Sequence, residues 1–104
     1  MKRDTVYAIV DQERDHQDAK WGTIEAHPHE VGSWILIMES LLADARKAWQ
    51  STNGDRDAMG EIRKVVAVGI AAMEAQDCIP TREWEEHRKR EAAHLEAEIR
   101  RAGL

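Results

Sequence analysis

The sequence contains one cysteine, two prolines, six glycines and no phenylalanine among its 104 residues. The lone Cys78 excludes an internal disulfide and a cysteine metal cluster within one chain, so we interpret it as a small, partly buried apolar residue. The shortage of proline and glycine argues against a chain rich in turns. With 42% hydrophobic and 34% charged residues, the composition indicates a single compact helical domain.

The chain also lacks an excess of positive charge and any long apolar run. A formal net charge of −5 argues against binding to duplex nucleic acid or to a membrane surface, because both need concentrated positive charge. The longest apolar run, Trp34 to Met38, is too short to cross a bilayer, and the N-terminus lacks the apolar segment of a secretory signal. We therefore expect a cytosolic protein, to which a small anionic ligand would bind through a divalent cation.

Hydrophobic periodicity predicts four helices. The first runs from Asp4 or Thr5 to Lys20, and Gly22 terminates it. Its second half is polar, so that half is either solvated or lines a site. The second and third cover residues 31–49 and about 57–76, with Asp55 or Asp57 as the cap of the third. Thr81 is the expected cap of a charged last helix.

The turn-forming pair Asn53-Gly54 separates the two most apolar helices, so we predict an antiparallel hairpin of residues 31–49 and 57–76 at the centre of an all-α helical bundle. The third helix is apolar on two sides, which indicates a central position in a bundle or an oligomer. Residues 1–79 form the predicted core. Residues 80–104 have only a narrow apolar stripe, and we expect them to pack on the bundle or on a partner subunit.

The tryptophan and histidine residues include several candidate ligand contacts. His27 and His29 lie in the loop 22–30, where they are more typical of surface or capping residues than of metal ligands. Trp34 fits the core stripe. Trp21 ends the polar half-helix, where its indole would stack on a base while Lys20 or Arg14 contacts phosphate. The alternative is that Trp21 is a hydrophobic anchor for the first helix.

Glu39 and Glu61 each interrupt an apolar helical stretch, and a carboxylate that loses water there needs a metal, a cation or good donors. An antiparallel hairpin would bring the two opposite each other, where they would bind Mg²⁺ or Mn²⁺. The alternative is that each forms a salt bridge, for which Arg46 and Lys64 are available.

The strings ERDHQDAKWG, WILIMESLLADARKAW and EIRKVVAVGIAAME resemble short phage and bacterial proteins related to the MazG-like all-α nucleotide pyrophosphohydrolases. The resemblance covers residues 6 to about 76. It implies a helical bundle that forms dimers or tetramers in the host cytoplasm and uses Mg²⁺ to cut a nucleoside triphosphate into a monophosphate and pyrophosphate. Glu39 and Glu61 match the first acids of the family's E-x-x-E and E-x-x-D pairs, and these two residues are the predicted metal-binding and catalytic acids.

The second acid of each pair is absent, because Leu42 and Lys64 stand in those positions. In an alternative alignment Asp44 takes the position of the second acid of the first pair, but Leu41 then stands where the first acid should be. Other acids would have to contribute in an active enzyme, and the nearest candidates by motif context are Glu13, Asp18, Glu30 and Glu74. In an inactive protein, Lys64 would meet phosphate directly.

The sequence thus supports two kinds of function. The leading hypothesis is a homo-oligomeric nucleotide-binding protein, with Glu39 and Glu61 on the metal, Trp21 on the base, and Arg14, Lys20 or Lys64 on phosphate. The alternatives are a non-catalytic interaction or assembly protein, in which both glutamates form salt bridges, and a protein that captures nucleotides without cleaving them.

Overall fold

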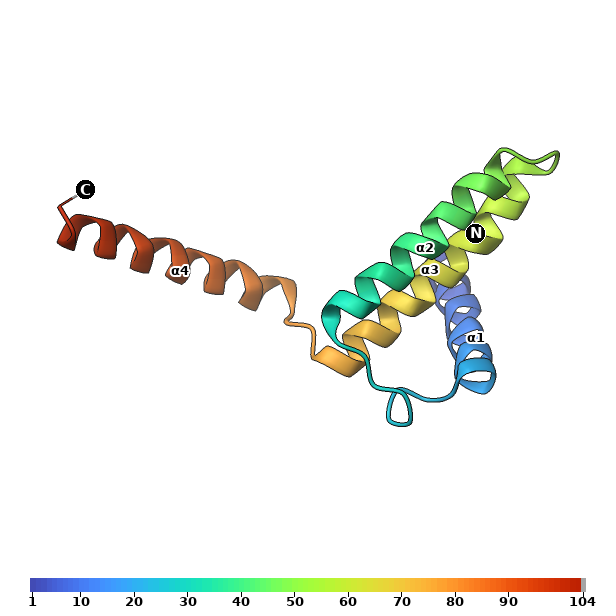
Figure 1. Ribbon diagram of the computed structural model, residues 1–104, viewed down its shortest axis with the longest axis horizontal. Helices are drawn as coiled ribbons and strands as arrows, with labels where there is room; N and C mark the ends of the chain where they lie inside the picture. Colours follow the sequence, from blue (N-terminus) through green and yellow to red (C-terminus); the bar gives the residue numbers. More distant parts are fainter. Residues whose placement is uncertain (104) are drawn as a thin grey trace.

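The computed structural model describes residues 1–103 and contains four helices in that range (Figure 1). They are α1 (Arg3–Trp21), α2 (Val31–Trp49), α3 (Gly54–Gln76) and α4 (Thr81–Arg101). No strand occurs in this part of the chain. The predicted all-α class and the central antiparallel hairpin, formed by α2 and α3, are confirmed.

The α2–α3 hairpin carries the main apolar core. Trp34 of α2 packs against Val68 and Ala71 of α3, and six partly buried apolar residues surround this cluster: Ile24, Ile37, Met38, Leu41, Ala72 and Ala75. The other fully shielded positions of the hairpin are small, namely Ala45, Ala58 and Ala67. Close approach of the two helices therefore depends on alanine rather than on interlocking large side chains.

The helix ends follow local backbone chemistry, with two corrections. Gly22 ends α1 as predicted, with a φ of 91° that an L side chain rarely adopts and an N–H that donates to Asp18 O over 2.9 Å. The third helix begins at Gly54, three residues before the predicted start, so Asp57 lies inside its first turn rather than capping it. Pro80 precedes the first residue of α4, Thr81, so the prediction of Thr81 as the cap was wrong; the fixed φ of proline suits this entry.

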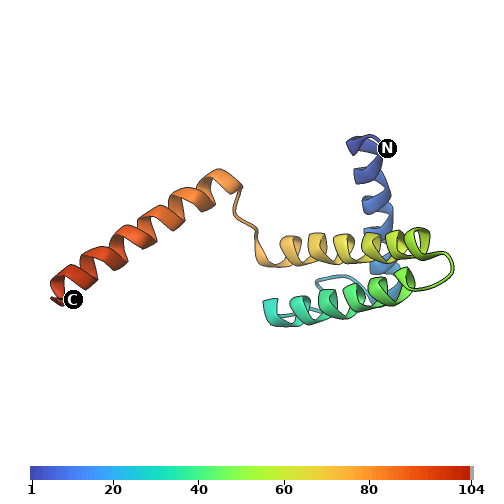
Figure 2. The ribbon, with the colours of Figure 1, turned by 90° about the horizontal axis from the view of Figure 1, so that it is seen from above.

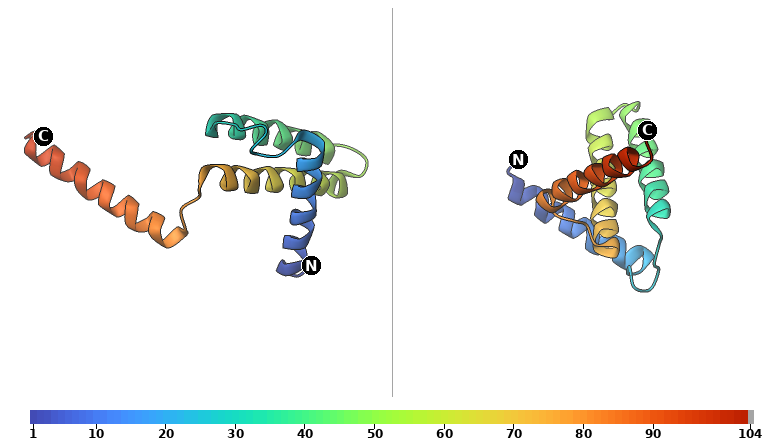
Figure 3. Two further views of the ribbon diagram at one scale, coloured as in Figure 1. Left: turned by 90° about the horizontal axis from the view of Figure 1, so that it is seen from below. Right: turned by 90° about the vertical axis from the view of Figure 1, so that its left-hand side faces the viewer.

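Helix α1 crosses α3 at a steep angle rather than lying along the hairpin (Figures 2 and 3). Its residues with the least exposure are Val10, Glu13, Arg14 and Gln17. Three residues of the polar half of α1, Glu13, Arg14 and Gln17, are therefore shielded from solvent.

Helix α4 projects away from the other three helices and makes no close backbone contact with them (Figures 1 and 3). The Cα radius of gyration is 18.8 Å, against about 13 Å for a compact chain of this length. Its apolar stripe of Trp84, Leu95 and Ile99 is exposed along its length. Within one chain α4 does not pack on the bundle, and packing on a partner subunit stays a prediction. No helix in residues 1–103 is long and apolar enough to cross a membrane.

Candidate functional site

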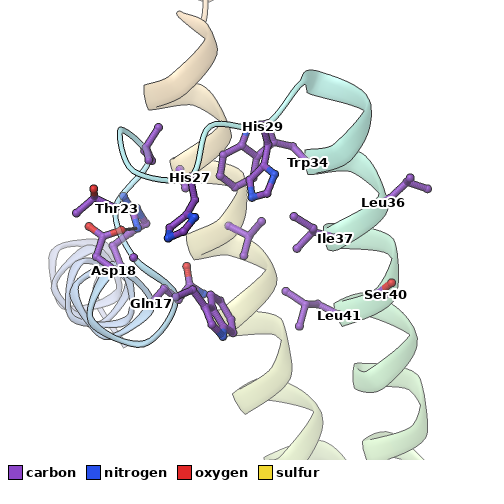
Figure 4. A pocket seen from close by; sticks show the side chains of 16 residues that line it. Gln17, Asp18, Thr23, His27, His29, Trp34, Leu36, Ile37, Ser40 and Leu41 are labelled. Atoms are coloured by element: carbon purple, nitrogen blue, oxygen red, sulfur yellow. Dashed lines mark hydrogen bonds and ion pairs between the residues drawn. The ribbon is translucent and has the colours of Figure 1, made fainter.

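A cavity of about 470 Å³ lies where α1, the loop 22–30 and the hairpin meet. Trp21 and Trp34 line it together with Ile24, and Figure 4 shows Ile37 and Leu41 projecting toward it from α2. Its volume lies in the range of small-molecule sites, which are typically apolar with a few polar groups. The geometry thus brings together one predicted base-stacking residue, Trp21, and one residue that the sequence assigned to the core, Trp34.

Trp34, which lines this cavity, carries an unpaired hydrogen-bond donor. Trp34 is 7% exposed, and its indole Nε1–H has no hydrogen-bond acceptor among the described residues. The imidazole ring of His29 meets the indole ring edge-on at 4.9 Å between centroids. Gln76 Nε2 donates to His29 O over 3.0 Å, which ties the loop to the end of α3. Buried N–H groups in proteins are nearly always paired, so this unpaired donor marks an unusual position in the wall of the cavity.

The loop that closes the cavity depends on Gly22. A Cβ at this position would lie 2.4 Å from the imidazole Cδ2 of His27. The side chain of His27 lines the cavity and projects from the loop between α1 and α2 (Figure 4). Any larger residue at position 22 would therefore have to displace His27 as well as adopt a strained φ.

A three-residue charge cluster borders the cavity through Arg14 and Asp18. Arg14 donates from Nε and NH2 to Glu74 Oε2, each over 2.9 Å, and from NH1 to Asp18 Oδ1 over 2.8 Å. Burial by itself lowers the pKa of the Arg14 guanidinium, but the hydrogen bonds that it donates to Asp18 and Glu74, together with the negative charges of these carboxylates, outweigh burial and raise the pKa above its usual value. Arg14 is therefore a permanent cation that holds α1 against α3.

The structure places Lys64 away from this cavity. Lys64 lines a smaller pocket of about 300 Å³ with Glu13, His16 and Arg63. Arg63 Nε donates to Glu13 Oε1 over 2.8 Å, and Gln17 Nε2 donates to Lys64 O over 3.2 Å. Of the predicted phosphate contacts, only Arg14 lines the larger cavity.

Lys20 lies beside Trp21, which lines the cavity. Its Nζ is 5.4 Å from the centroid of the Trp21 ring. Trp21 is 49% exposed, so one predicted base-stacking surface is open to solvent and to ligands. The predicted pair of Trp21 and Lys20 is therefore close in space as well as in sequence.

The two predicted metal ligands lie in different surroundings. Glu61 of α3 is half-buried and accepts a hydrogen bond from Lys64 Nζ over 3.1 Å, which is the salt bridge that the alternative interpretation foresaw. Glu39 is exposed on α2, about 140° around the helix from Trp34, which packs on α3. The hairpin does not turn these carboxylates toward each other within one chain.

Three of the four acids named as substitutes are held by basic side chains. Asp18 and Glu74 share Arg14, while Glu13 pairs with Arg63. Glu30 is the residue before α2. Within residues 1–103, no three His, Cys, Asp or Glu residues lie close enough to hold a metal ion. Within one chain the predicted ligands Glu39 and Glu61 therefore do not come together with further acids, and we derive no step through Mg²⁺.

Comparison with protein-family models, with curated proteins and with solved structures finds no match for this chain. The resemblance to the MazG-like pyrophosphohydrolases stays a prediction from the sequence strings.

Sequence reasoning missed three features of the site. It did not foresee that Arg14 pairs with Asp18 and Glu74, that Gln17 is 4% exposed, or that Trp34 borders a cavity. A signal for the first two was present, because Glu13, Arg14 and Gln17 continue the apolar line of Val6 and Val10 at helical spacing. Polar residues on such a line indicate a buried polar contact.

Proposed function

We propose that this protein binds a nucleotide and that the base occupies the cavity between α1, the loop 22–30 and the hairpin. The observation that carries the proposal is the buried, unpaired indole N–H of Trp34 at a cavity of about 470 Å³. A nucleobase combines flat apolar faces with hydrogen-bond acceptors on its edge. The cavity has aromatic and aliphatic walls, and the indole of Trp34 in its wall carries a donor that has no partner among the described residues.

The basic side chains near the cavity suggest where the phosphates would lie. Lys20 forms no ion pair within the described residues, whereas Arg14 is already paired with two carboxylates. Lys20 therefore supplies charge for phosphate in this proposal, and Arg14 positions α1 so that Trp21 and the cavity wall are held in place. Lys64 has no role in this arrangement because it lines the other pocket.

Cleavage of the α–β phosphate bond with Mg²⁺ is the activity that the resemblance adds to binding. Its ligands would be Glu39 and Glu61, and neither lines the cavity. Binding has support from the geometry, while hydrolysis rests on the resemblance alone. Pyrophosphate release should therefore be measured separately from binding, with Mg²⁺ and with Mn²⁺.

Calorimetry with a panel of nucleoside mono- and triphosphates tests binding, first in EDTA and then with Mg²⁺. We expect binding in EDTA, because none of the groups that line the cavity needs a metal. Trp34→Phe keeps an aromatic ring but removes the N–H, so affinity should fall about 3- to 10-fold, the value of one neutral hydrogen bond. The matched control is Trp84→Phe on α4, which should leave affinity unchanged.

The second candidate is a non-catalytic interaction protein. The salt bridge between Glu61 and Lys64 and the projecting, amphipathic α4 favour it. Absence of binding by every nucleotide in the panel, with and without a divalent cation, would reject the nucleotide proposal and leave this alternative. Binding without pyrophosphate release would instead identify a protein that captures nucleotides.

A further inference from the structure

Gln17 is more deeply buried than the other polar side chains that line the cavity. It is 4% exposed and reaches the cavity from the second half of α1. Its Nε2 donates to Lys64 O over 3.2 Å. A buried amide costs free energy unless its polar atoms are paired, and this hydrogen bond offsets the cost at the nitrogen end alone. The oxygen end of the amide needs a donor of its own.

The hydrogen bond to α3 fixes which way this amide points. Because a carbonyl oxygen only accepts, the atom that faces Lys64 O is Nε2 and not Oε1. Among residues 1–103, no group donates to Gln17 Oε1. Figure 4 shows Gln17 projecting from α1 toward the hairpin, opposite Ile37 and Leu41 of α2, with its oxygen on the side of His27. A buried acceptor therefore faces the cavity.

The other polar side chains of the cavity wall are either paired or close to solvent. Arg14 NH1 donates to Asp18 Oδ1 over 2.8 Å, so these two residues are engaged with each other. Thr23 and Ser40 are exposed. Gln17 Oε1 is thus the deeply buried acceptor that a ligand in the cavity would meet.

We propose that Gln17 selects the base of the bound nucleotide by accepting a hydrogen bond from an amino group on the base. This role rests on the proposed nucleotide binding and adds to the site a residue that distinguishes one base from another. The backbone of α3 holds the Gln17 amide in place before the ligand arrives, so little side-chain entropy is lost on binding. A base without the amino group would leave Oε1 buried and unpaired, which is how a polar site rejects a close analogue.

An amide side chain matches adenine. In the usual pairing of glutamine with this base, Oε1 accepts from the amino group and Nε2 donates to the neighbouring ring nitrogen. Gln17 has the atoms for both bonds, because Nε2 carries two hydrogen atoms and Lys64 O accepts one of them. Guanine carries a carbonyl oxygen in place of the amino group, and this oxygen would face Oε1 as a second acceptor. The ligand class is therefore an adenine nucleotide.

The neighbours of Gln17 on α1 fit the same orientation of the ligand. Trp21 follows Gln17 by four residues, so the two side chains are adjacent on one face of the helix. Trp21 is 49% exposed, and Lys20 Nζ lies 5.4 Å from the centroid of its ring. With the edge of the base at the buried Gln17 and its face on Trp21, the phosphates lie toward Lys20 and solvent.

Calorimetry of the full chain in EDTA with three matched nucleotides tests this contact. They are AMP, IMP, which has a carbonyl in place of the amino group, and the monophosphate of purine riboside, which has hydrogen there. The wild type should bind AMP about 10-fold more tightly than either analogue. Gln17→Met keeps the length of the side chain but removes the amide, so the three affinities should become equal. The matched control is Gln12→Met, at an exposed position of α1 outside the cavity, which should keep the preference.

A second variant guards against a loss of structure in the first. Gln17→Asn keeps the amide but shortens the side chain by one methylene, so it should also lose the preference for AMP, and circular dichroism checks that both variants are folded. Equal affinities of the wild type for AMP and its analogues, or a preference that survives in the Gln17 variants, would overturn the assignment and leave nucleotide binding intact. Absence of binding by every nucleotide would instead reject the proposed function.

Discussion

The two interfaces of α3 are built from different kinds of side chain. Toward α2, α3 presents Val68 and Ala71 to Trp34, and the contact is apolar. Toward α1, it presents Glu74 and Arg63 to the buried Arg14 and Glu13. Apolar burial supplies stability without fixing direction, whereas charged hydrogen bonds are directional. The apolar interface thus holds the hairpin together, and the polar interface sets the angle at which α1 crosses it.

This contrast explains the position of the cavity. Because α1 is attached through Arg14 and Glu13 near its middle, its C-terminal end and the following loop stand off from the hairpin. The cavity occupies the space beneath them, between Trp21 and Leu41. A helix attached by a continuous apolar stripe would have closed this space.

The largest effect is expected at the apolar interface. Trp34→Ala removes a nearly buried indole from the main cluster and should lower the free energy of unfolding by about 3–5 kcal/mol. Chemical denaturation followed by circular dichroism measures the change. A loss no larger than that of Trp49→Ala, at an exposed position of the same helix, would show that the hairpin core is not the main source of stability.

A smaller effect is expected at the polar interface. Arg14→Met leaves the carboxylates of Asp18 and Glu74 close together without their cation, and should cost about 1–2 kcal/mol, since both carboxylates are partly solvated. The same denaturation experiment measures it. Adding Glu74→Leu should recover part of the loss, because an apolar pair replaces the remaining charge. No recovery would mean that Arg14 acts through packing alone.

The smallest effect is expected at Glu61. Its pair with Lys64 lies within one turn of α3 and is partly exposed, so Glu61→Gln should change the free energy of unfolding by no more than about 0.5 kcal/mol. Nucleotide affinity in EDTA should not change either, because Glu61 does not line the cavity. A loss of Mg²⁺-dependent pyrophosphate release in this variant, with fold and affinity intact, would instead support a metal-binding role.

The apolar interface could be predicted from the sequence and the polar one could not. The spacing of Trp34 and Leu41, and the Asn53-Gly54 turn, correctly predict the hairpin because large apolar residues on one helical face must be buried. The spacing of Arg14 and Gln17 places them on the buried line of α1, but it does not identify the partners that a buried polar group needs. The partners Glu74 and Lys64 belong to another helix, and helical spacing carries no information about them.

The sequence could not predict that α4 lies apart from the other helices of its own chain. Trp84, Leu95 and Ile99 form a stripe that indicates a packing partner but not whether that partner belongs to the same chain. The position of Glu39 could not be predicted for a similar reason. Its place at the edge of an apolar stripe fits both the inner side of a hairpin and an interface between chains, and the structure assigns it to the exposed side.

The projection of α4 divides the molecule electrostatically. Residues 81–101 carry six basic and six acidic side chains, so the whole formal charge of −5 resides on the three-helix part that contains the cavity. An anionic ligand approaching that part meets net repulsion, which decays over about 8 Å at physiological ionic strength. Its rate of association should therefore rise as salt is added, the reverse of the behaviour of a protein that attracts its ligand from a distance.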